Sequence, residues 1–254
     1  MSAQLAIVGA LSRRGLNEIL RVPGASIPGV LAPTIFLVGI TSVFGAVASL
    51  PGFTGDDFIT YVVPVGMLQG AAFTGAATGV NLARDIERGW FDRLLLVPAA
   101  RTTLLAGIVG SATLRCLLPA GVVLLVGLLL GASFPGVLGL LLSVVLVMAT
   151  AASLAFYAIT LALRFRTQQA APLMQMGSFI AVLFTTAYAP EEFLQGWLRT
   201  IANLNPVTYV MEGVRQGFVG EVTWADTWPA LLAAGGMMLV LGLLAVRGMR
   251  RTGR

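Results

Sequence analysis

The sequence contains no histidine, no lysine and a single cysteine, Cys116. The lack of histidine excludes a His-based catalytic triad and most zinc sites, and one cysteine cannot form an intrachain disulfide. We therefore expect neither catalytic residues nor a metal site. The phosphate-binding loop of ATPases requires a lysine, so this chain cannot form that motif. If ATP drives the protein, another polypeptide binds it.

Charge is scarce as well. Only 11% of the 254 residues are charged, against about 25% in soluble domains, whereas 57% are hydrophobic and the mean hydropathy is +0.90. A soluble domain could not solvate its surface with so few charges. The composition predicts an integral membrane protein. The arginines behind the net charge of +5 are scattered along the chain, which disfavours nucleic-acid binding.

Six apolar runs are long enough to cross a bilayer, which takes roughly 20 residues per helix. They cover residues 28–50, 58–83, 104–131, 137–163, 170–189 and 229–246. Transmembrane β-strands would alternate in polarity, and these runs do not. Gly75 and Gly79 form one of three G-x-x-x-G pairs within these runs, which permit close helix contact, although thirty glycines also produce such pairs by chance. The sequence thus predicts an all-α membrane protein with six transmembrane helices.

The arginines predict the orientation of these spans. Thirteen of the sixteen lie in the N-terminal segment, the 84–101 and 164–169 loops and the C-terminal tail. The opposite side holds only Arg199 and Arg215, beside seven acids. By the positive-inside rule, both termini are cytoplasmic. Residues 1–254 then form a single domain, with a tail at 247–254.

Residues 1–27 do not form a secretory signal, because their first apolar stretch is short and Arg13 and Arg14 follow it. Apolar residues fall near one helical face, and most charges lie off it. The apolar set is Leu5, Val8, Leu16, Ile19 and Leu20. This pattern favours an amphipathic interfacial helix in the cytoplasmic headgroup region, ending near Pro23. A loosely ordered polar terminus is the alternative.

The six spans contain no Asp, Glu, Lys or His, which ion-driven transporters usually need at membrane depth. Their one charge is Arg115, about eleven residues into the third span. This side chain either snorkels to the inner headgroups or contacts a neighbouring helix, and a direct substrate contact is a third alternative.

Polar and aromatic residues on the second and fifth spans are candidates for a substrate path. They are Gln69, Phe73, Asn81, Gln175, Phe179, Thr186 and Tyr188. Gln69 with Phe73, and Gln175 with Phe179, are i,i+4 pairs on one helical face. The alternative is that these side chains only pack between helices.

Residues 84–101 hold four arginines and three acids. Ile86, Trp90, Leu94 and Val97 recur at helical spacing, which predicts an interfacial segment that buries Trp90. Arg84, Asp85, Arg88 and Asp92 share another face. A surface with both signs of charge suits docking to a soluble partner, whereas a solvated loop without a partner is the alternative.

The outer segment 190–228 is patterned as two short amphipathic helices dipping into the outer leaflet. Pro190 opens the first helix, and Asn205 and Pro206 are the N-cap and first residue of the second. Glu212 and Arg215 form an i,i+3 pair on it. The apolar faces comprise Phe193, Trp197, Leu198 and Ile201, then Val207, Val210, Met211, Val214 and Phe218. The two helices either cover the exit of a pathway or stabilise the bundle as a cap.

These two segments, in this order around six spans, resemble the permease subunits of type-2 ABC exporters. The stretch R-D-I-E-R-G-W-F-D-R-L-L-L-V-P-A-A-R is similar to that family's loop after span two, with an acidic–Gly–aromatic pattern, then Leu, and Pro shortly before Arg. The stretch N-P-V-T-Y-V-M-E-G-V-R is similar to its Asn/Gln-Pro-x-Thr segment. The spacing from Asp92 to Arg101 and the arginine in span three look closest to the daunorubicin-resistance-like branch of multidrug and lipid exporters.

The resemblance implies a non-catalytic permease subunit of an ATP-driven exporter of drugs, antibiotics or lipids in the bacterial inner membrane. It implies no cofactor on this chain, two copies of an ATP-binding subunit carrying ATP and Mg, and a second permease, identical or related. Spans two and five would face the substrate path. The loop 51–57 is too short for an extracellular domain. The residues implied to couple the chain to the ATPase are Arg84, Asp85, Glu87, Arg88, Trp90, Asp92 and Arg93.

Two other functional classes remain as alternatives. One is an ion-coupled carrier or channel acting without an ATPase, which the missing membrane carboxylates disfavour. The other is a membrane-embedded lipid enzyme, which lacks His, Lys and clustered acids. The sequence does not identify the substrate, and the direction of transport follows from family likeness alone.

Overall fold

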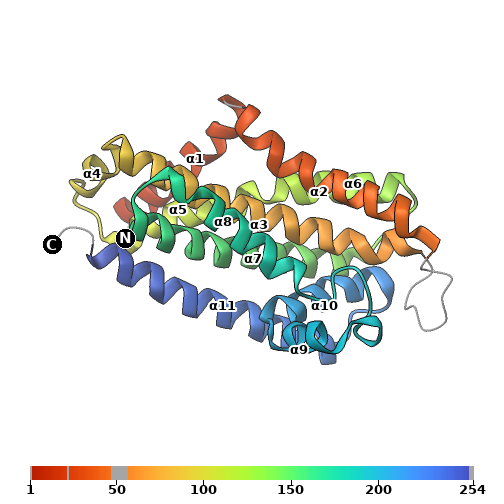
Figure 1. The fold of residues 1–254 in the computed structure, drawn as a ribbon. Helices are drawn as coiled ribbons and strands as arrows, with labels where there is room; N and C mark the ends of the chain where they lie inside the picture. Colours follow the sequence, from red (N-terminus) through yellow and green to blue (C-terminus); the bar gives the residue numbers. More distant parts are fainter. Residues whose placement is uncertain (1, 22, 47–56, 252–254) are drawn as a thin grey trace.

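The computed structural model describes residues 2–21, 23–46 and 57–251, and within these ranges the secondary structure is helical, without strands. The all-α prediction is therefore confirmed for the described residues. The 51–57 loop, apart from Asp57, and the last three residues of the tail lie outside them. Figure 1 shows long helices side by side, with α4 (Trp90–Leu95) at one end and α9 (Gly196–Leu204) near the other. We call these the α4 end and the α9 end.

Helix α3 (Phe58–Glu87) is at the centre of the bundle, and it packs along α7 (Gly136–Phe165). A Cβ atom on Gly79 would lie 2.5 Å from the backbone carbonyl carbon of Ala158, and one on Gly75 would lie 2.8 Å from the backbone nitrogen of Ala155. Only glycine permits this approach, so the close contact predicted from Gly75 and Gly79 is confirmed.

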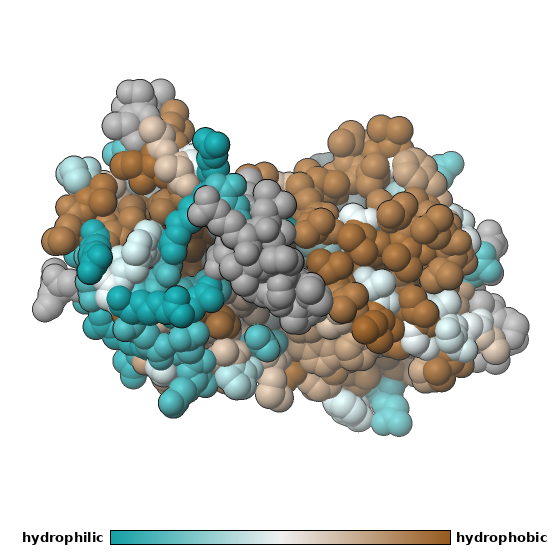
Figure 2. Space-filling model, turned by 90° about the horizontal axis from the view of Figure 1, so that it is seen from above, coloured by the Kyte–Doolittle hydropathy of each residue, from teal (hydrophilic) through white to brown (hydrophobic). Residues whose placement is uncertain are grey.

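The outer helices carry an apolar surface. Among the described residues, four helical segments are long and apolar enough to cross a membrane, namely Phe58–Glu87, Arg101–Leu129, Gly136–Phe165 and Trp224–Arg251. The last of these is α11, and α2 (Pro23–Phe44) contributes a shorter apolar stretch, Gly29–Phe44. Figure 2 shows hydrophobic residues over most of one face and hydrophilic residues gathered toward the α4 end. Large exposed apolar surfaces of this kind face lipid in a multi-pass membrane protein.

The predicted third span consists of two helices, α5 (Arg101–Arg115) and α6 (Leu117–Leu129), which meet at Cys116. The backbone of Cys116 keeps right-handed helical angles. Pro119 has no N–H group to donate to the carbonyl four residues earlier, that of Arg115. The path of the chain is therefore nearly continuous, although Pro119 cannot make the usual backbone hydrogen bond.

The predicted fifth span is wrong in its second half. Helix α8 (Ala171–Leu183) has only 13 residues, which gives a length of about 20 Å, short of the roughly 30 Å hydrocarbon core. Residues 184–189 follow without regular structure. Apolar composition suggested a helix there, but side chains from α10 (Pro206–Val219) bind the carbonyls of this segment and replace helical hydrogen bonds.

The N-terminal helix α1 (Ser2–Arg21) is present, and α2 begins at Pro23 instead of residue 28. Helix α1 packs on α5, where the Ser12 hydroxyl donates to the Gly107 carbonyl at 3.4 Å. The start of α1 and the end of α11 both lie toward the α4 end. The helix is thus confirmed, and its interfacial placement stays a prediction.

Candidate functional site

The charged segment at the α4 end is a helix–turn–helix and not one continuous periodic segment. Helix α3 continues to Glu87, and Gly89 has a φ of 68°, a left-handed conformation that only glycine adopts without strain. Helix α4 then restarts at Trp90. This break changes the helical phase. Phe91 is fully buried in the bundle, whereas Trp90 is partly exposed, and the burial of Trp90 in the membrane interface stays a prediction.

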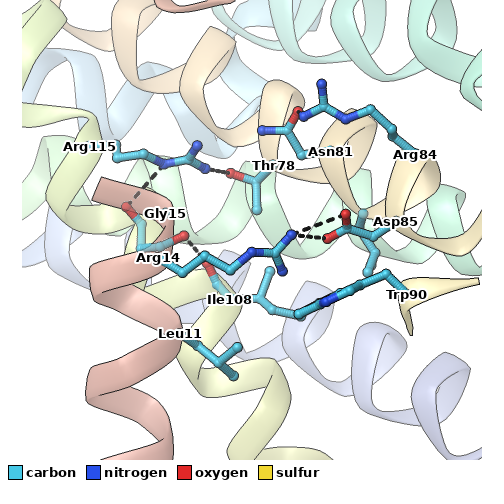
Figure 3. A pocket seen from close by; sticks show the side chains of 12 residues that line it. Leu11, Arg14, Gly15, Thr78, Asn81, Arg84, Asp85, Trp90, Ile108 and Arg115 are labelled. Carbon is cyan, nitrogen blue, oxygen red and sulfur yellow. Dashed lines mark hydrogen bonds and ion pairs between the residues drawn. The ribbon is translucent and has the colours of Figure 1, made fainter. Parts of the chain in front are cut away.

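An arginine on α1 holds this turn. The guanidinium of Arg14 donates to both carboxylate oxygens of Asp85, at 3.0 and 3.2 Å. The same guanidinium lies 3.6 Å from the centroid of the Trp90 ring, a cation–π contact. Figure 3 shows Arg14 between these two side chains. Asp85 and Trp90 therefore position α4 against the N-terminal helix.

Glu87 connects the turn to the loop between α7 and α8. Its carboxylate accepts hydrogen bonds from the Thr167 hydroxyl at 2.8 Å and from the Gln168 backbone N–H at 2.9 Å. The Gln168 side-chain amide donates to the other carboxylate oxygen at 2.5 Å. The sequence offered no signal for this pairing, because the partners are 80 residues away. Glu87 thus serves to orient the turn.

Four of the seven predicted coupling residues are exposed. Glu87 is one of them and is held by Thr167 and Gln168, and the other three are Arg88, Asp92 and Arg93. Asp92 lies 3.8 Å from Arg166, with both side chains more than half exposed, so this ion pair contributes little to stability. The turn therefore divides into anchoring residues and an exposed set with both signs of charge, which suits docking to a soluble surface.

Four of the predicted path residues, from α3, α8 and the segment after α8, form two pairs. The Gln69 amide donates to the Tyr188 hydroxyl at 2.7 Å, and Gln69 is buried. The Phe73 ring stacks on Phe179, with centroids 6.2 Å apart and planes 13° apart. Gln175 is exposed on α8 and belongs to neither pair. Within one copy of the chain, the four paired residues pack between helices.

Arg115 and Asn81 lie near the α4 end, away from these pairs. Arg115 is only 9% exposed, and its guanidinium donates to the Thr78 hydroxyl on α3 at 2.7 Å and to the Ser111 carbonyl at 3.3 Å. Arg115 therefore contacts a neighbouring helix, one of the predicted alternatives. The Arg84 guanidinium donates to the Asn81 side-chain oxygen at 2.7 Å. Asn81 thus belongs to the charged end.

The second outer helix, α10, begins as predicted. The Asn205 side chain accepts from the Val207 N–H at 3.0 Å, and Pro206 is the first helical residue. All five apolar positions of the predicted face are buried. The helix does not merely dip into a leaflet, because it packs against α7, α3 and α11. The first helix, α9, begins at Gly196 instead of Pro190, after a short 3₁₀ turn.

Arg215 is the centre of a polar cluster that sequence reasoning missed. It is 4% exposed, and its guanidinium donates to the carbonyls of Thr186 at 2.8 Å and Ala187 at 3.2 Å, and to Glu212 at 2.6 Å. The ring of Tyr61 lies 3.7 Å below it. We call these five residues the Arg215 network. The i,i+3 spacing predicted the pair with Glu212, but nothing local indicated the carbonyl ligands.

Asn205 supplies further hydrogen bonds to backbone carbonyls at the end of α8 and at the start of the irregular segment 184–189, which we call the unwound segment. Its side-chain amide donates to the carbonyls of Ala181 and Phe184, both at 2.8 Å. Buried backbone carbonyls in a membrane require such side-chain partners. The cap role of Asn205 was visible in the sequence, whereas its second role was not.

A separate set of hydrogen bonds lies on the surface. The Asn203 amide and the Arg199 guanidinium donate to the Glu191 carboxylate and lower its pKa.

Comparison with known proteins agrees with the architecture. Residues 7–219 match the family model described as ABC-2 type transporter. The chain is 26% identical over 243 residues to the daunorubicin resistance ABC transporter permease protein DrrB1 of Streptomyces coeruleorubidus, covering 92% of this chain and 82% of that one. It is 30% identical over 230 residues to the transport permease ycf38 of Pyropia yezoensis, covering 87% and 76%. It is 26% identical over 247 residues to a doxorubicin resistance ABC transporter permease protein, DrrC, of Mycobacterium tuberculosis, covering 95% and 86%.

Proposed function

The chain belongs to the ABC-2 type transporter family, and we propose that it is the membrane-spanning permease subunit of an ATP-driven exporter. Its cargo would be amphipathic or hydrophobic molecules, such as drugs, antibiotics or lipids, taken from the cytoplasm or the inner leaflet. The drug-resistance names of two relatives support this cargo class. Weakly polar and aromatic side chains on α3 and α8 support it as well.

In the proposed arrangement, the α4 end faces the cytoplasm of a bacterial cell. Six helical passes would cross the membrane, namely α2, α3, α5 with α6, α7, α8 and α11. Hydrophilic residues gather toward the α4 end (Figure 2), and thirteen arginines lie in the N-terminal segment, the 84–101 and 164–169 loops and the tail, which supports this orientation through the positive-inside rule. Helix α8 is short, so residues 184–189 and the Arg215 network would complete its crossing of the membrane.

The proposal rests on the turn between α3 and α4, at Gly89, in a chain of the ABC-2 type transporter family. Gly89 sets α4 off from α3, Arg14 and Glu87 fix its position, and exposed charges remain on its outer surface. This chain has no phosphate-binding loop, so ATP and Mg would bind to a separate subunit, present in two copies. Helix α4 would be the coupling helix, and Arg88, Asp92 and Arg93 would contact that subunit directly.

The substrate path would lie between two copies of the permease, or between this chain and a related one. The ring centroid of Phe36 on α2 lies 6.1 Å from that of Phe179, and Phe179 also stacks on Phe73. These partly exposed rings form an apolar edge. Gln175 is exposed on α8, the same helix as Phe179. A second permease facing this edge would enclose an aromatic path with few hydrogen-bonding groups.

Charge reversal at α4 tests the coupling role. Arg88→Glu and Asp92→Arg are expected to abolish ATP-dependent uptake of a fluorescent amphipathic dye into inverted membrane vesicles, with unchanged amounts of protein in the membrane. Arg250→Glu is the matched control, because this exposed arginine lies at the same end of the bundle but on another helix, α11. Normal transport by both α4 variants would contradict the proposal.

Affinity purification of the tagged chain from its own membranes tests the partner. A stoichiometric ATP-binding subunit is the expected companion. If the chain purifies alone in every mild detergent, and moves solute alone in liposomes, the carrier or channel alternative replaces the exporter.

A further inference from the structure

The connection between α7 and α8 lies against the turn between α3 and α4, at the α4 end (Figure 1). We call residues 164–170 the α7–α8 corner. Thr167 and Gln168 of this corner donate three hydrogen bonds to Glu87 at the end of α3. The guanidinium of Arg166 lies 3.8 Å from the carboxylate of Asp92 on α4. Two segments that are far apart in the sequence therefore form one continuous surface.

Arg166 ends α7 in an unusual backbone conformation. Its φ is 57° and its ψ is 22°, and among the described residues it is the one non-glycine residue with a positive φ. Glycine is the usual residue in this left-handed conformation at the end of a helix. The turn of the chain needs only the backbone, so a glycine would make it with less strain. Because strained residues gather at functional sites, this position indicates a role for the arginine side chain.

The α7–α8 corner extends the exposed charged surface of α4. Arg164, Phe165 and Arg166 are all exposed, and Phe165 is 50% exposed. The joint surface of the corner and the α4 turn carries four arginines and two carboxylates, which leave an excess of two positive charges. These six exposed residues are Glu87, Arg88, Asp92, Arg93, Arg164 and Arg166.

This composition fits a protein partner better than a membrane surface. Aromatic residues and arginine are enriched where proteins bind one another, and Phe165 is flanked by two arginines. An anionic membrane surface would attract the arginines, but it would repel the exposed carboxylate of Asp92. The excess of positive charge favours a partner surface rich in carboxylates, which the guanidinium group binds through two parallel hydrogen bonds.

We infer that the α7–α8 corner is a second docking element for the ATP-binding subunit, which contacts the corner and α4 together through a surface rich in carboxylates. Arg164 and Arg166 would pair with those carboxylates, and Phe165 would pack between them. Glu87 ties the corner to the end of α3, so a movement of the subunit would reach α7 and α8 as well as α3. This role rests on the proposed function, because it requires the ATP-binding partner.

Photocrosslinking in native membranes tests the two docking elements separately in the full-length chain. The photoreactive residue p-benzoylphenylalanine is placed at Phe165 in the corner, at Arg93 on α4 or at Phe193. Phe193 is the matched control, because it is 46% exposed in the turn before α9, at the opposite end. Mass spectrometry of the products is expected to identify a protein with a phosphate-binding loop at positions 165 and 93, but not at 193.

The other crosslinking outcomes distinguish failure of this role from failure of the proposed function. Capture of the ATP-binding subunit at position 93 alone would overturn the docking role of the corner and leave the proposed function intact. Capture of lipid alone at position 165 would overturn it as well, because Phe165 would then face the membrane. Capture of the subunit at neither position would contradict both.

Variants of Arg166 separate docking from folding. Arg166→Glu is expected to weaken binding of the co-purified ATP-binding subunit about tenfold, as for the loss of one charge pair at an interface. Arg166→Gly removes the guanidinium but relieves the backbone, so binding should weaken while the unfolding temperature stays the same or rises. Arg250→Glu on α11 is the control and should bind normally. Normal binding by both Arg166 variants, or equal loss in Arg250→Glu, would overturn the docking role.

Discussion

The guanidinium of Arg215 lies 3.7 Å from the centroid of the Tyr61 ring, deep in the α9 end of the bundle. The Tyr61 hydroxyl donates to the Thr186 carbonyl at 3.0 Å, the same carbonyl that Arg215 binds. One backbone oxygen in the unwound segment thus has two buried side-chain donors from two different helices. This arrangement explains how a chain in a membrane ends a helix early without leaving its carbonyls unpaired.

Arg215→Gln is expected to destabilise the protein by about 2–4 kcal/mol, because the change leaves two carbonyls and the half-exposed Glu212 without their charged partner. Cys116 is buried and is the chain's one cysteine, so thermal unfolding in detergent is measured by its reaction with a thiol-reactive fluorophore. Arg199→Gln, which breaks an exposed ion pair, is the control and costs less than about 1 kcal/mol. Equal losses of stability in the Arg215→Gln and Arg199→Gln variants would contradict the role of Arg215 in stabilising residues 184–189.

Asn205→Ser and Asn205→Ala separate the two roles of this residue. Serine preserves the N-cap acceptor but removes the amide that binds the Ala181 and Phe184 carbonyls, at a cost of about 1–3 kcal/mol. Alanine removes the cap as well, for about 1 kcal/mol more. Hydrogen exchange of residues 184–189 should increase in both variants. A serine variant that exchanges like the original chain would show that the amide contacts contribute nothing.

Gly79→Val is expected to destabilise the bundle by about 1–3 kcal/mol, because its side chain would overlap the backbone of Ala158. Gly121→Val is the matched control on α6, where no described atom lies within 4 Å of an added Cβ. The unfolding temperature in detergent compares the two variants. Similar temperatures would mean that α3 and α7 can separate without cost.

Gly89 variants test the helix break without a clash against the surrounding helices, since no described neighbouring atom lies within 4 Å of an added Cβ. Gly89→Val is expected to cost about 1–2 kcal/mol through its left-handed backbone and to reduce transport by displacing α4. Asparagine tolerates this conformation, so Gly89→Asn should retain most of the transport activity. Dye uptake into inverted vesicles measures both variants. Full transport by Gly89→Val would show that the break is dispensable.

The membrane class, most helix positions and the start of α10 could be predicted from the sequence alone. These features follow from local chemistry. Apolar runs must leave water, and Asn205 followed by Pro206 caps and begins a helix whatever surrounds it. The buried face of α10 was equally predictable, because apolar residues at helical spacing gather on one side.

The pairing of the polar groups, in contrast, depends on how the helices pack. The end of α8 depends on Arg215 and Asn205, which lie more than 20 residues away in the chain. The burial of Phe91 in the bundle depends on the backbone angle of Gly89 and on Arg14 from α1. The polar residues can be read from the sequence, but their hydrogen bonds and ion pairs join segments that are far apart in the chain. Their partners therefore become known only from the way the helices pack.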